Sequence, residues 1–109
     1  MTFPYETPEP PYYAVIFPST RTEGERGYDA MAEKMAKLAA EQPGFLGLET
    51  VREASGNGIT ISYWESEEAI LAWHHNPEHQ KAQEAGRSTW YKDYRLRIAK
   101  VERAYGKEH

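Results

Sequence analysis

Apolar side chains in the first third of the chain follow two different spacings, and each spacing predicts one element. Residues 12–18 (YYAVIFP) are almost all apolar, which favours a buried strand that ends at Pro18. After a loop at residues 19–24, apolar side chains recur every three or four positions in residues 25–42, the spacing of an amphipathic helix. The apolar stripe of this helix comprises Tyr28, Met31, Met35 and Leu38.

The next two apolar segments predict an antiparallel hairpin. Residues 45–53 (FLGLETVRE) and residues 59–64 (ITISYW) contain many residue types that favour strands. Between them, Asn57-Gly58 readily adopts positive φ, so we expect the hairpin turn at this pair.

Two short helices and a final strand complete the expected order. Ser66 is a suitable N-cap for a helix that Asn76-Pro77 then interrupts. Because asparagine is a good cap and proline is favoured at the first helical position, another helix is expected to begin at this pair and run to about Gly86. Residues 95–105 are expected to form a long terminal strand.

This order predicts an α+β domain with the ferredoxin-like split βαβ arrangement and an antiparallel sheet. Right-handed crossovers place both helical segments on one face of the sheet. The first strand is nevertheless apolar on both faces, with Ala14 and Ile16 on one and Tyr13, Val15 and Phe17 on the other. Either the sheet is an exposed amphipathic one or a second copy of the chain covers it, and the apolar content favours a two-fold homodimer.

The terminal strand carries a second indication of a partner. Its apolar alternation changes phase between two sets of residues, which are Tyr94, Leu96 and Ile98, and then Val101, Arg103 and Tyr105. Such a slip predicts either a bulge near Ala99-Lys100 or a strand that leaves its own sheet for that of the partner.

The chain is expected to hold one domain between two short extensions. Residues 1–11 contain four prolines and are expected to form an extended N-terminal arm, mobile or laid across a neighbour. Residues 12–105 form the domain and residues 106–109 a C-terminal tail. A length of 109 residues suffices for one hydrophobic core.

Composition excludes several classes of protein. There is no cysteine, so disulfides and thiol chemistry are excluded. The net charge is −4 and the two signs are interspersed, which argues against nucleic-acid binding. The N-terminus lacks a signal pattern and no apolar run reaches the ~20 residues of a membrane span, so a cytoplasmic protein is expected.

Residues 69–94 concentrate imidazole and aromatic side chains in one short helical region. Such side chains either fill a core or line a cavity. His75 and His79 are four residues apart, but Asn76-Pro77 between them breaks the helical register and no familiar ligand spacing is complete, so no metal site is expected.

Several segments of the chain together resemble the antibiotic biosynthesis monooxygenase superfamily of dimeric α/β barrels. They are QPGFLG, SYWESEEAILAW, EHQKAQ, GRSTWY and YRLRIAKVERAY, and the likeness covers residues 12–105. Its most recognisable part after the PGF element is the set Trp64, Ser66, Glu68, Ala69 and Trp73. The family includes cofactor-free oxygenases of aromatic polyketides or quinols, haem-degrading oxygenases, and proteins with no known reaction.

The resemblance implies a homodimer with a pocket between the helices and the sheet of each subunit. There, an electron-rich aromatic molecule would react with dioxygen without metal or flavin, in a dry site with a proton-transfer group. Imidazole titrates near neutral pH and can serve as that group, and arginine with tyrosine can hold an oxyanion. The candidate catalytic residues are His79, His74, Arg87 and Tyr91, and the candidate substrate-binding residues are Trp73, Trp90, Tyr94 and Tyr63.

Breakdown or isomerisation of a small metabolite is an alternative that the sequence does not separate from oxygenation. Two further alternatives remain open. One is haem binding and degradation: the resemblance places a tryptophan at Trp73 but carries the iron ligand onto Gln83, a poor haem ligand, and residues 12–18 lack the asparagine of that branch. His79 would replace the ligand only in a changed geometry. The other is a non-catalytic binding protein, in which the aromatic residues fill the core and the dimer rim.

Overall fold

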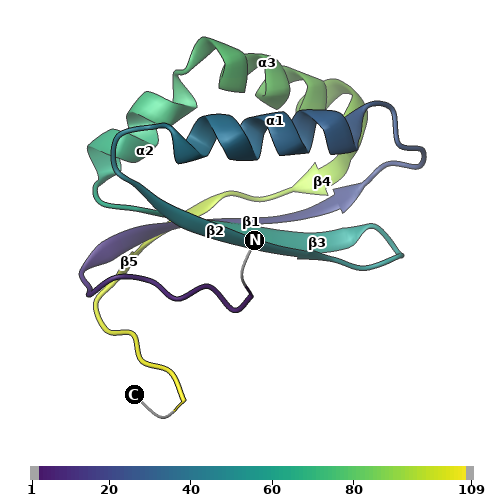
Figure 1. Cartoon of the computed structure of the whole chain (residues 1–109). Helices are drawn as coiled ribbons and strands as arrows, with labels where there is room; N and C mark the ends of the chain where they lie inside the picture. The colour runs from purple at the N-terminus through teal and green to yellow at the C-terminus, as the bar shows by residue number, and fades with distance from the viewer. Residues whose placement is uncertain (1–2, 108–109) are drawn as a thin grey trace.

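The structure, a computed structural model that describes residues 3–107, has three helices on one face of an antiparallel sheet (Figure 1). Its elements are β1 (Tyr12–Arg21), α1 (Tyr28–Ala40), β2 (Phe45–Arg52), β3 (Asn57–Trp64), α2 (Glu67–His74), α3 (Pro77–Ala85), a π-helical turn η1 (Gly86–Trp90), β4 (Tyr91–Tyr94) and β5 (Arg97–Val101). The strand order is β2-β3-β1-β4, and β5 also pairs with β1. This order confirms the ferredoxin-like split βαβ prediction. The outermost residues of the arm and of the tail, 1–2 and 108–109, lie outside the described residues.

The first strand is longer than predicted, because it continues through Pro18 to Arg21. Proline is tolerated at this position because it lies beside the gap between β4 and β5. The carbonyl of Pro18 accepts a bond of 3.0 Å from the Arg95 N–H, in the gap between β4 and β5. Since the N–H and C=O of one strand residue point to the same neighbour, the donor that proline lacks would face this gap.

The hairpin turn also lies earlier than predicted. Gly56, with φ of 100°, takes the positive-φ position, while Asn57 and Gly58 already belong to β3. The turn is closed by hydrogen bonds between Glu53 and Asn57 and between Gly56 and Glu53. Several residues of the segment ASGNG can make a turn, and the cross-strand pairing of Arg52 with Gly58 selects which of them does.

Two further boundaries differ from the prediction. Helix α1 begins at Tyr28 because Arg26 and Gly27 have positive φ, which is incompatible with an α-helix. The terminal strand is divided at residues 95–96 rather than bulged at Ala99-Lys100, where the pairing of β5 with β1 is regular.

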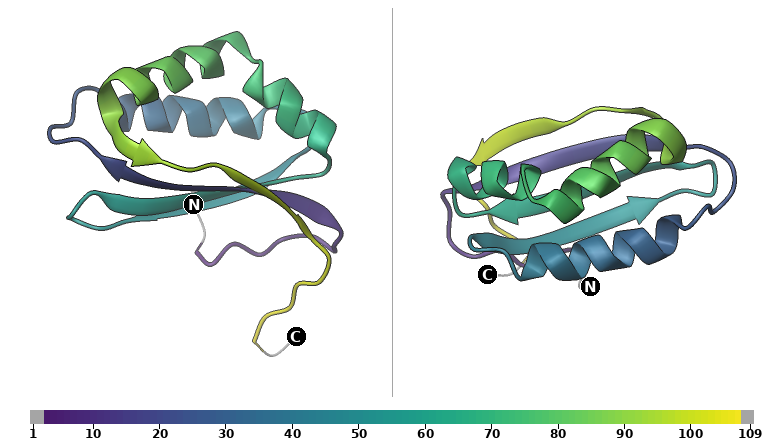
Figure 2. Two further views of the ribbon diagram at one scale, coloured as in Figure 1. Left: turned by 180° about the vertical axis from the view of Figure 1, so that it is seen from behind. Right: turned by 90° about the horizontal axis from the view of Figure 1, so that it is seen from above.

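The two faces of the sheet have different coverings. Figure 2 shows α1 beside α2 and α3 over one face. The face under the helices includes Phe45 and Trp64, which pair across β2 and β3 and whose rings meet edge to face at 5.3 Å. Trp64 is fully buried. Ala39, Ile70 and Trp90 are also buried, whereas Tyr12 and Ala14 of β1 are buried on the opposite face of the sheet from Trp64.

The N-terminal arm lies against the face of the sheet that has no helices (Figure 1). The Tyr5 N–H donates to Glu49 at 2.8 Å, and the Tyr5 ring stacks on Tyr63 with centroids 6.1 Å apart. The same ring lies on the backbone of Gly47, where a Cβ would fall 2.1 Å from it. Gly47 therefore allows Tyr5 to rest flat on the sheet. The arm covers only the end of this face that carries Gly47 and Tyr63.

Candidate functional site

Aromatic and imidazole side chains gather at the junction of α2 and α3. The rings of Trp73 and His79 are stacked, with centroids 4.0 Å apart and planes at 11°. Trp73 in turn stacks on the buried Trp64 at 6.3 Å. The Gln83 amide lies 3.4 Å from His79 Nδ1. We call Trp64, Trp73, His79 and Gln83 the tryptophan–histidine cluster.

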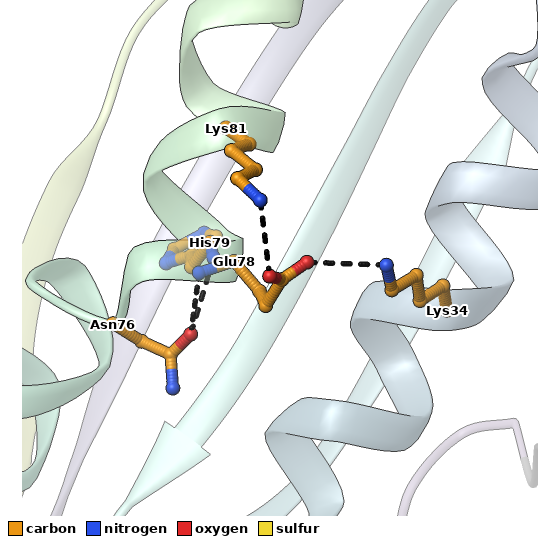
Figure 3. A network of polar contacts seen from close by, with 5 residues as sticks. All are labelled: Lys34, Asn76, Glu78, His79 and Lys81. Carbon is orange, nitrogen blue, oxygen red and sulfur yellow. Dashed lines mark hydrogen bonds and ion pairs between the residues drawn. The ribbon is translucent and has the colours of Figure 1, made fainter.

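Two helix caps place this cluster. The Ser66 hydroxyl accepts from the Ala69 N–H at 3.1 Å and starts α2, which carries Trp73. Asn76 leaves the helical conformation, and its side chain accepts from the Glu78 and His79 N–H groups at 3.0 and 3.2 Å (Figure 3). The predicted break at Asn76-Pro77 is therefore confirmed. The break changes the direction of the chain between α2 and α3, so that the His79 ring stacks on the Trp73 ring.

An exposed ion-pair network ties the first turn of α3 to α1. Glu78 lies 3.1 Å from Lys34 and 3.3 Å from Lys81 (Figure 3). These hydrogen bonds from the two ammonium groups lower the pKa of the Glu78 carboxyl. The pairs are solvent-exposed, so they orient α3 on α1 more than they stabilise the fold.

The hydrogen bonds of His79 define its tautomer. Its Nδ1 lies 2.9 Å from the Trp73 carbonyl oxygen, which can only accept, so Nδ1 carries the proton and Nε2 keeps its lone pair. Burial of the ring lowers the pKa of His79, and this effect exceeds the opposite one of the Trp73 carbonyl. A neutral imidazole with a free Nε2 lone pair can act as a general base.

The other two histidines of this region do not join the cluster. His74 and His75 are exposed, and their rings contact each other at 5.3 Å. The His74 carbonyl accepts from the Gln83 amide at 2.9 Å, so its backbone supports the cluster while its imidazole points elsewhere. Of the predicted candidates, the structure thus brings together His79 and Trp73.

A second group of side chains lies at the far end of the same layer. The Tyr91 hydroxyl donates to the Tyr28 hydroxyl at 3.3 Å, and the Arg21 guanidinium lies 3.7 Å over the Tyr28 ring. Arg52 reaches from β2 to β1, where it donates to the Ser19 hydroxyl at 2.7 Å. We call Arg21, Tyr28, Arg52 and Tyr91 the arginine–tyrosine cluster.

The π-helical turn η1 brings the aromatic residues of this end together. Trp90 is buried, donates from its indole to the Arg26 carbonyl at 3.1 Å, and meets Tyr28 edge to face. A Cβ on Gly86 would stand 3.1 Å from the Tyr91 ring, so the small residue makes room for it. The predicted candidates Trp90, Tyr91 and Tyr94 therefore lie at one end, where the two tyrosines contact each other and Phe17 packs against both.

Burial and the bond to Tyr28 raise the pKa of Tyr91 well above its ordinary value, while the positive charges of Arg52 and Arg21 act in the opposite direction. Tyr91 is therefore a neutral hydroxyl that can donate a hydrogen bond. The two arginines close to it were not among the candidates from the sequence. Their one signal, a basic residue at the end of an apolar strand, is shared by many surface arginines.

Two predicted candidates lie elsewhere. Arg87 is exposed and bonded to Glu84 at 2.7 Å, outside both clusters, and this bond together with the nearby Tyr94 hydroxyl raises the pKa of its guanidinium. Tyr63 lies on the opposite face of the sheet, under the arm, and donates to Glu49 at 2.6 Å. Burial and this carboxylate raise the pKa of Tyr63. Within one chain, the sheet separates Tyr63 from Trp73.

The layer between the helices and the sheet is only partly closed. Facing side chains such as Phe17, Met35, Leu48 and Trp73 are half-buried rather than buried. A cavity of about 340 Å³ opens at the arginine end, between the end of β1 and the β2–β3 turn, with Arg21 and Arg52 in its wall. Its volume is in the range of small-molecule sites.

Among residues 3–107, no group of three or more His, Asp or Glu side chains is arranged to hold a metal ion. None of the described helices is both long enough and apolar enough to cross a membrane.

The fold and these clusters define a ferredoxin-like α+β domain with a polar aromatic layer under its helices. Solved structures share this fold, including SnoaB, a cofactor-independent oxygenase from Streptomyces nogalater. SnoaB matches with a TM-score of 0.76 and 15% identity over 87% of this chain and 97% of its own.

Comparisons of sequence are more specific. The antibiotic biosynthesis monooxygenase family matches residues 11–85. An uncharacterised Bacillus subtilis protein, YqjZ, is 60% identical over 94% of this chain and 90% of its own length. A jasmonate monooxygenase from Pyricularia oryzae is 30% identical over 82% of this chain, which spans 43% of that relative. The chain belongs to the antibiotic biosynthesis monooxygenase family, as its resemblance predicted.

Proposed function

We propose that the protein is a cofactor-independent monooxygenase that oxygenates a small aromatic molecule, polyketide- or quinol-like, in the layer between helices and sheet. Membership of the family supports a monooxygenase, as do the names of the Pyricularia relative and of SnoaB. The observation that carries the proposal is the stacked Trp73–His79 pair, in which a neutral imidazole with a free Nε2 lies against a flat apolar ring.

In this proposal, His79 takes the proton of an acidic phenol or activated methylene, and the resulting anion is electron-rich enough to reduce dioxygen. For a methylene carbon between aromatic rings, CH₂ and O₂ give C=O and H₂O, and the substrate supplies all four electrons. Trp73, backed by the buried Trp64, supplies an apolar wall that keeps water from the anion. Trp90, Tyr91 and Tyr94 bind the other end of the substrate, and the exposed His74 and Arg87 are assigned no step.

Dioxygen consumption tests the proposal directly. Naphthoquinol- and anthrone-type substrates are expected to give uptake in metal-free buffer, with jasmonate as the comparison suggested by the Pyricularia relative. His79→Gln is expected to lower kcat by about 10²- to 10⁴-fold, the usual contribution of a general base. His75→Gln, in the exposed neighbour, is the matched control and is expected to keep full activity.

The opposite results would leave a non-catalytic binding protein. If no substrate gives uptake, or if His79→Gln and His75→Gln behave alike, the proposed role of His79 is wrong. Binding without uptake, followed by quenching of tryptophan fluorescence, would favour the binding protein.

The residues do not fit the haem alternative. Gln83, the position that the resemblance assigns to the iron ligand, is an amide that donates to the His74 carbonyl. Haemin still provides a useful test, because a Soret shift that His79→Gln abolishes would replace the oxygenase proposal with haem binding.

We further propose a homodimer in which a second copy covers the part of the bare sheet face that the arm leaves open. This part is apolar and exposed at Val51 and Ile59, which are 52% and 42% accessible. Analytical ultracentrifugation at micromolar concentration is expected to give a dimer, and Ile59→Lys is expected to shift it toward the monomer. A monomer in the unmodified protein would contradict the dimeric barrel.

We also propose that this protein resides in the cytoplasm.

A further inference from the structure

We propose that Arg21 and Arg52 form a binding site for the carboxylate of an aromatic acid, at the opposite end of the layer from His79. This names the substrate class of the site described above, so its role in catalysis rests on the proposed function. The binding itself depends on the arginine–tyrosine cluster alone.

Neither arginine forms an ion pair with a described carboxylate, although the charge of Arg21 acts at longer range on the Glu25 carboxyl. Among residues 3–107, no carboxylate oxygen lies within 4.0 Å of either guanidinium, although five ion pairs form elsewhere on the surface. Both side chains are half-buried, and both positive charges act on the Tyr91 hydroxyl. Two like charges that act on the same hydroxyl repel each other, and an anion between them relieves this repulsion.

Neutral groups hold both guanidiniums in place. Arg21 donates from Nε to the Trp90 carbonyl at 3.1 Å and from Nη2 to the Gly24 carbonyl at 3.0 Å. Arg52 donates from Nη1 to the carbonyls of Ser19 and Gly56, and from Nη2 to the Ser19 hydroxyl. Carbonyl and hydroxyl acceptors fix the orientation of a guanidinium without neutralising it, so the site is preorganised for an anion.

Each guanidinium also has donors left over. A guanidinium has five N–H donors. The described part of the chain provides no acceptor for Nη1 of Arg21 or for Nε of Arg52. A carboxylate has two oxygens that accept from such donors and forms charge-assisted bonds with them.

The cavity of about 340 Å³ lies beside these donors, with Arg21 and Arg52 in its wall. The Arg21 guanidinium lies 3.7 Å over the Tyr28 ring, which further fixes its position in the cavity wall. Glu23 and Glu53 are exposed and also belong to the cavity wall. Their charges oppose an anion from the solvent side, which predicts that removal of the Glu53 charge strengthens binding.

Calorimetric titration of the full-length protein with 1-naphthoate and with its neutral analogue 1-naphthamide tests the site in the absence of turnover. The acid is expected to bind about tenfold tighter than the amide, the factor for one charge-assisted hydrogen bond. Arg21→Gln and Arg52→Gln are each expected to remove this preference. Arg95→Gln, which removes an exposed arginine paired with Asp93, is the matched control and is expected to keep it.

Two additional measurements complete the test. Glu53→Gln is expected to tighten naphthoate binding several-fold. Inorganic phosphate tests whether the natural ligand is a phosphate. If phosphate competes with naphthoate at similar concentration, the proposal of an aromatic acid is wrong and the site binds phosphate. Because Arg52 also braces the hairpin, the Nε–H NMR signals of the unmodified protein serve if Arg52→Gln does not fold. Naphthoate is expected to shift the signals of Arg21 and Arg52 but not that of Arg95.

Equal affinity for acid and amide would overturn the inference, as would equal losses in Arg21→Gln and Arg95→Gln. The proposed function fails separately. Dioxygen uptake without any preference for acids removes the carboxylate site alone, whereas acid-selective binding without uptake removes the oxygenase alone.

Discussion

The two ends of the layer between helices and sheet are both built on a buried tryptophan, yet they differ in charge. At the tryptophan–histidine end, Trp64 supports Trp73 and a neutral His79 whose Nδ1 is satisfied by a backbone carbonyl. At the arginine–tyrosine end, Trp90 supports Tyr28, over which the Arg21 guanidinium lies without a carboxylate partner among residues 3–107.

This difference predicts the orientation of a bound molecule in the layer. A molecule with an anionic group and an aromatic ring gains most when the anion lies at the arginines and the ring reaches toward the imidazole. Burial favours the uncharged form at both ends, with opposite consequences: it keeps a second proton off His79 and keeps the hydroxyl proton on Tyr91. One end can therefore accept a proton and the other can donate a hydrogen bond.

The largest expected effect is a loss of folding stability on substitution of Trp64, which joins the tryptophan–histidine cluster to the core. Trp64→Ala is expected to lower the free energy of unfolding by about 3–5 kcal/mol, because Trp64 is fully buried between the rings of Phe45 and Trp73. Urea denaturation followed by circular dichroism measures this. Trp73→Ala is the control and is expected to cost less, since Trp73 is half-buried and its loss opens to solvent. Equal costs would mean that the two tryptophans belong to one closed core.

The second effect concerns pH and distinguishes the two ends. In the unfolded chain His79 takes up its proton near pH 6.5, whereas burial delays this to lower pH in the folded chain. The free energy of unfolding is therefore expected to fall as the pH drops from about 6.5 through the lowered pKa of His79, by at most about 1.4 kcal/mol per pH unit. Tyr91 contributes nothing in this range, because its pKa is raised above its ordinary value of 10.0.

Urea titrations at a series of pH values between 5 and 8 measure this dependence. His79→Gln is expected to flatten the curve below pH 6.5, and His75→Gln, with its exposed side chain, is expected to leave it unchanged. A slope that survives in His79→Gln would show that other groups cause it.

The smallest effect concerns the cap that aims His79. Asn76→Ala is expected to cost about 1 kcal/mol, because its side chain accepts from two N–H groups at the start of α3. Asn76→Asp keeps an acceptor and is expected to lose much less. Thermal unfolding measures both. Lys34→Met, which breaks only an exposed ion pair, is expected to change the melting temperature less than Asn76→Ala does.

Local chemistry made much of the fold predictable. The period of apolar residues gave the helix of Met31 and Leu38, and the caps Ser66 and Asn76 gave the starts of α2 and α3 where the structure has them. Boundaries that depend on a neighbouring strand were predicted wrongly. Pro18 was expected to end β1, but the gap between β4 and β5 lets the strand continue.

The candidate site was predictable only where its members are close in the sequence. Trp73 and His79 lie six residues apart on two capped helices, and they meet. Arg87 was expected to hold an oxyanion of the substrate together with a tyrosine, yet η1 leaves it on the surface, where it is bonded to Glu84. Arg21 and Arg52 approach Tyr91 from β1 and β2, and no local pattern relates three such distant positions.

The sequence by itself determined the order of the elements and the two capped helices, because these depend on contacts within a few residues. Only the tertiary structure decided which charges stand together. Strand pairing and helix packing bring Arg21, Arg52 and Tyr91 to one end of the layer, and they leave Arg87 outside and Tyr63 on the other face. The sign of the charge around a site is a sum over neighbours in space, and strand register, which long-range packing sets, selects those neighbours.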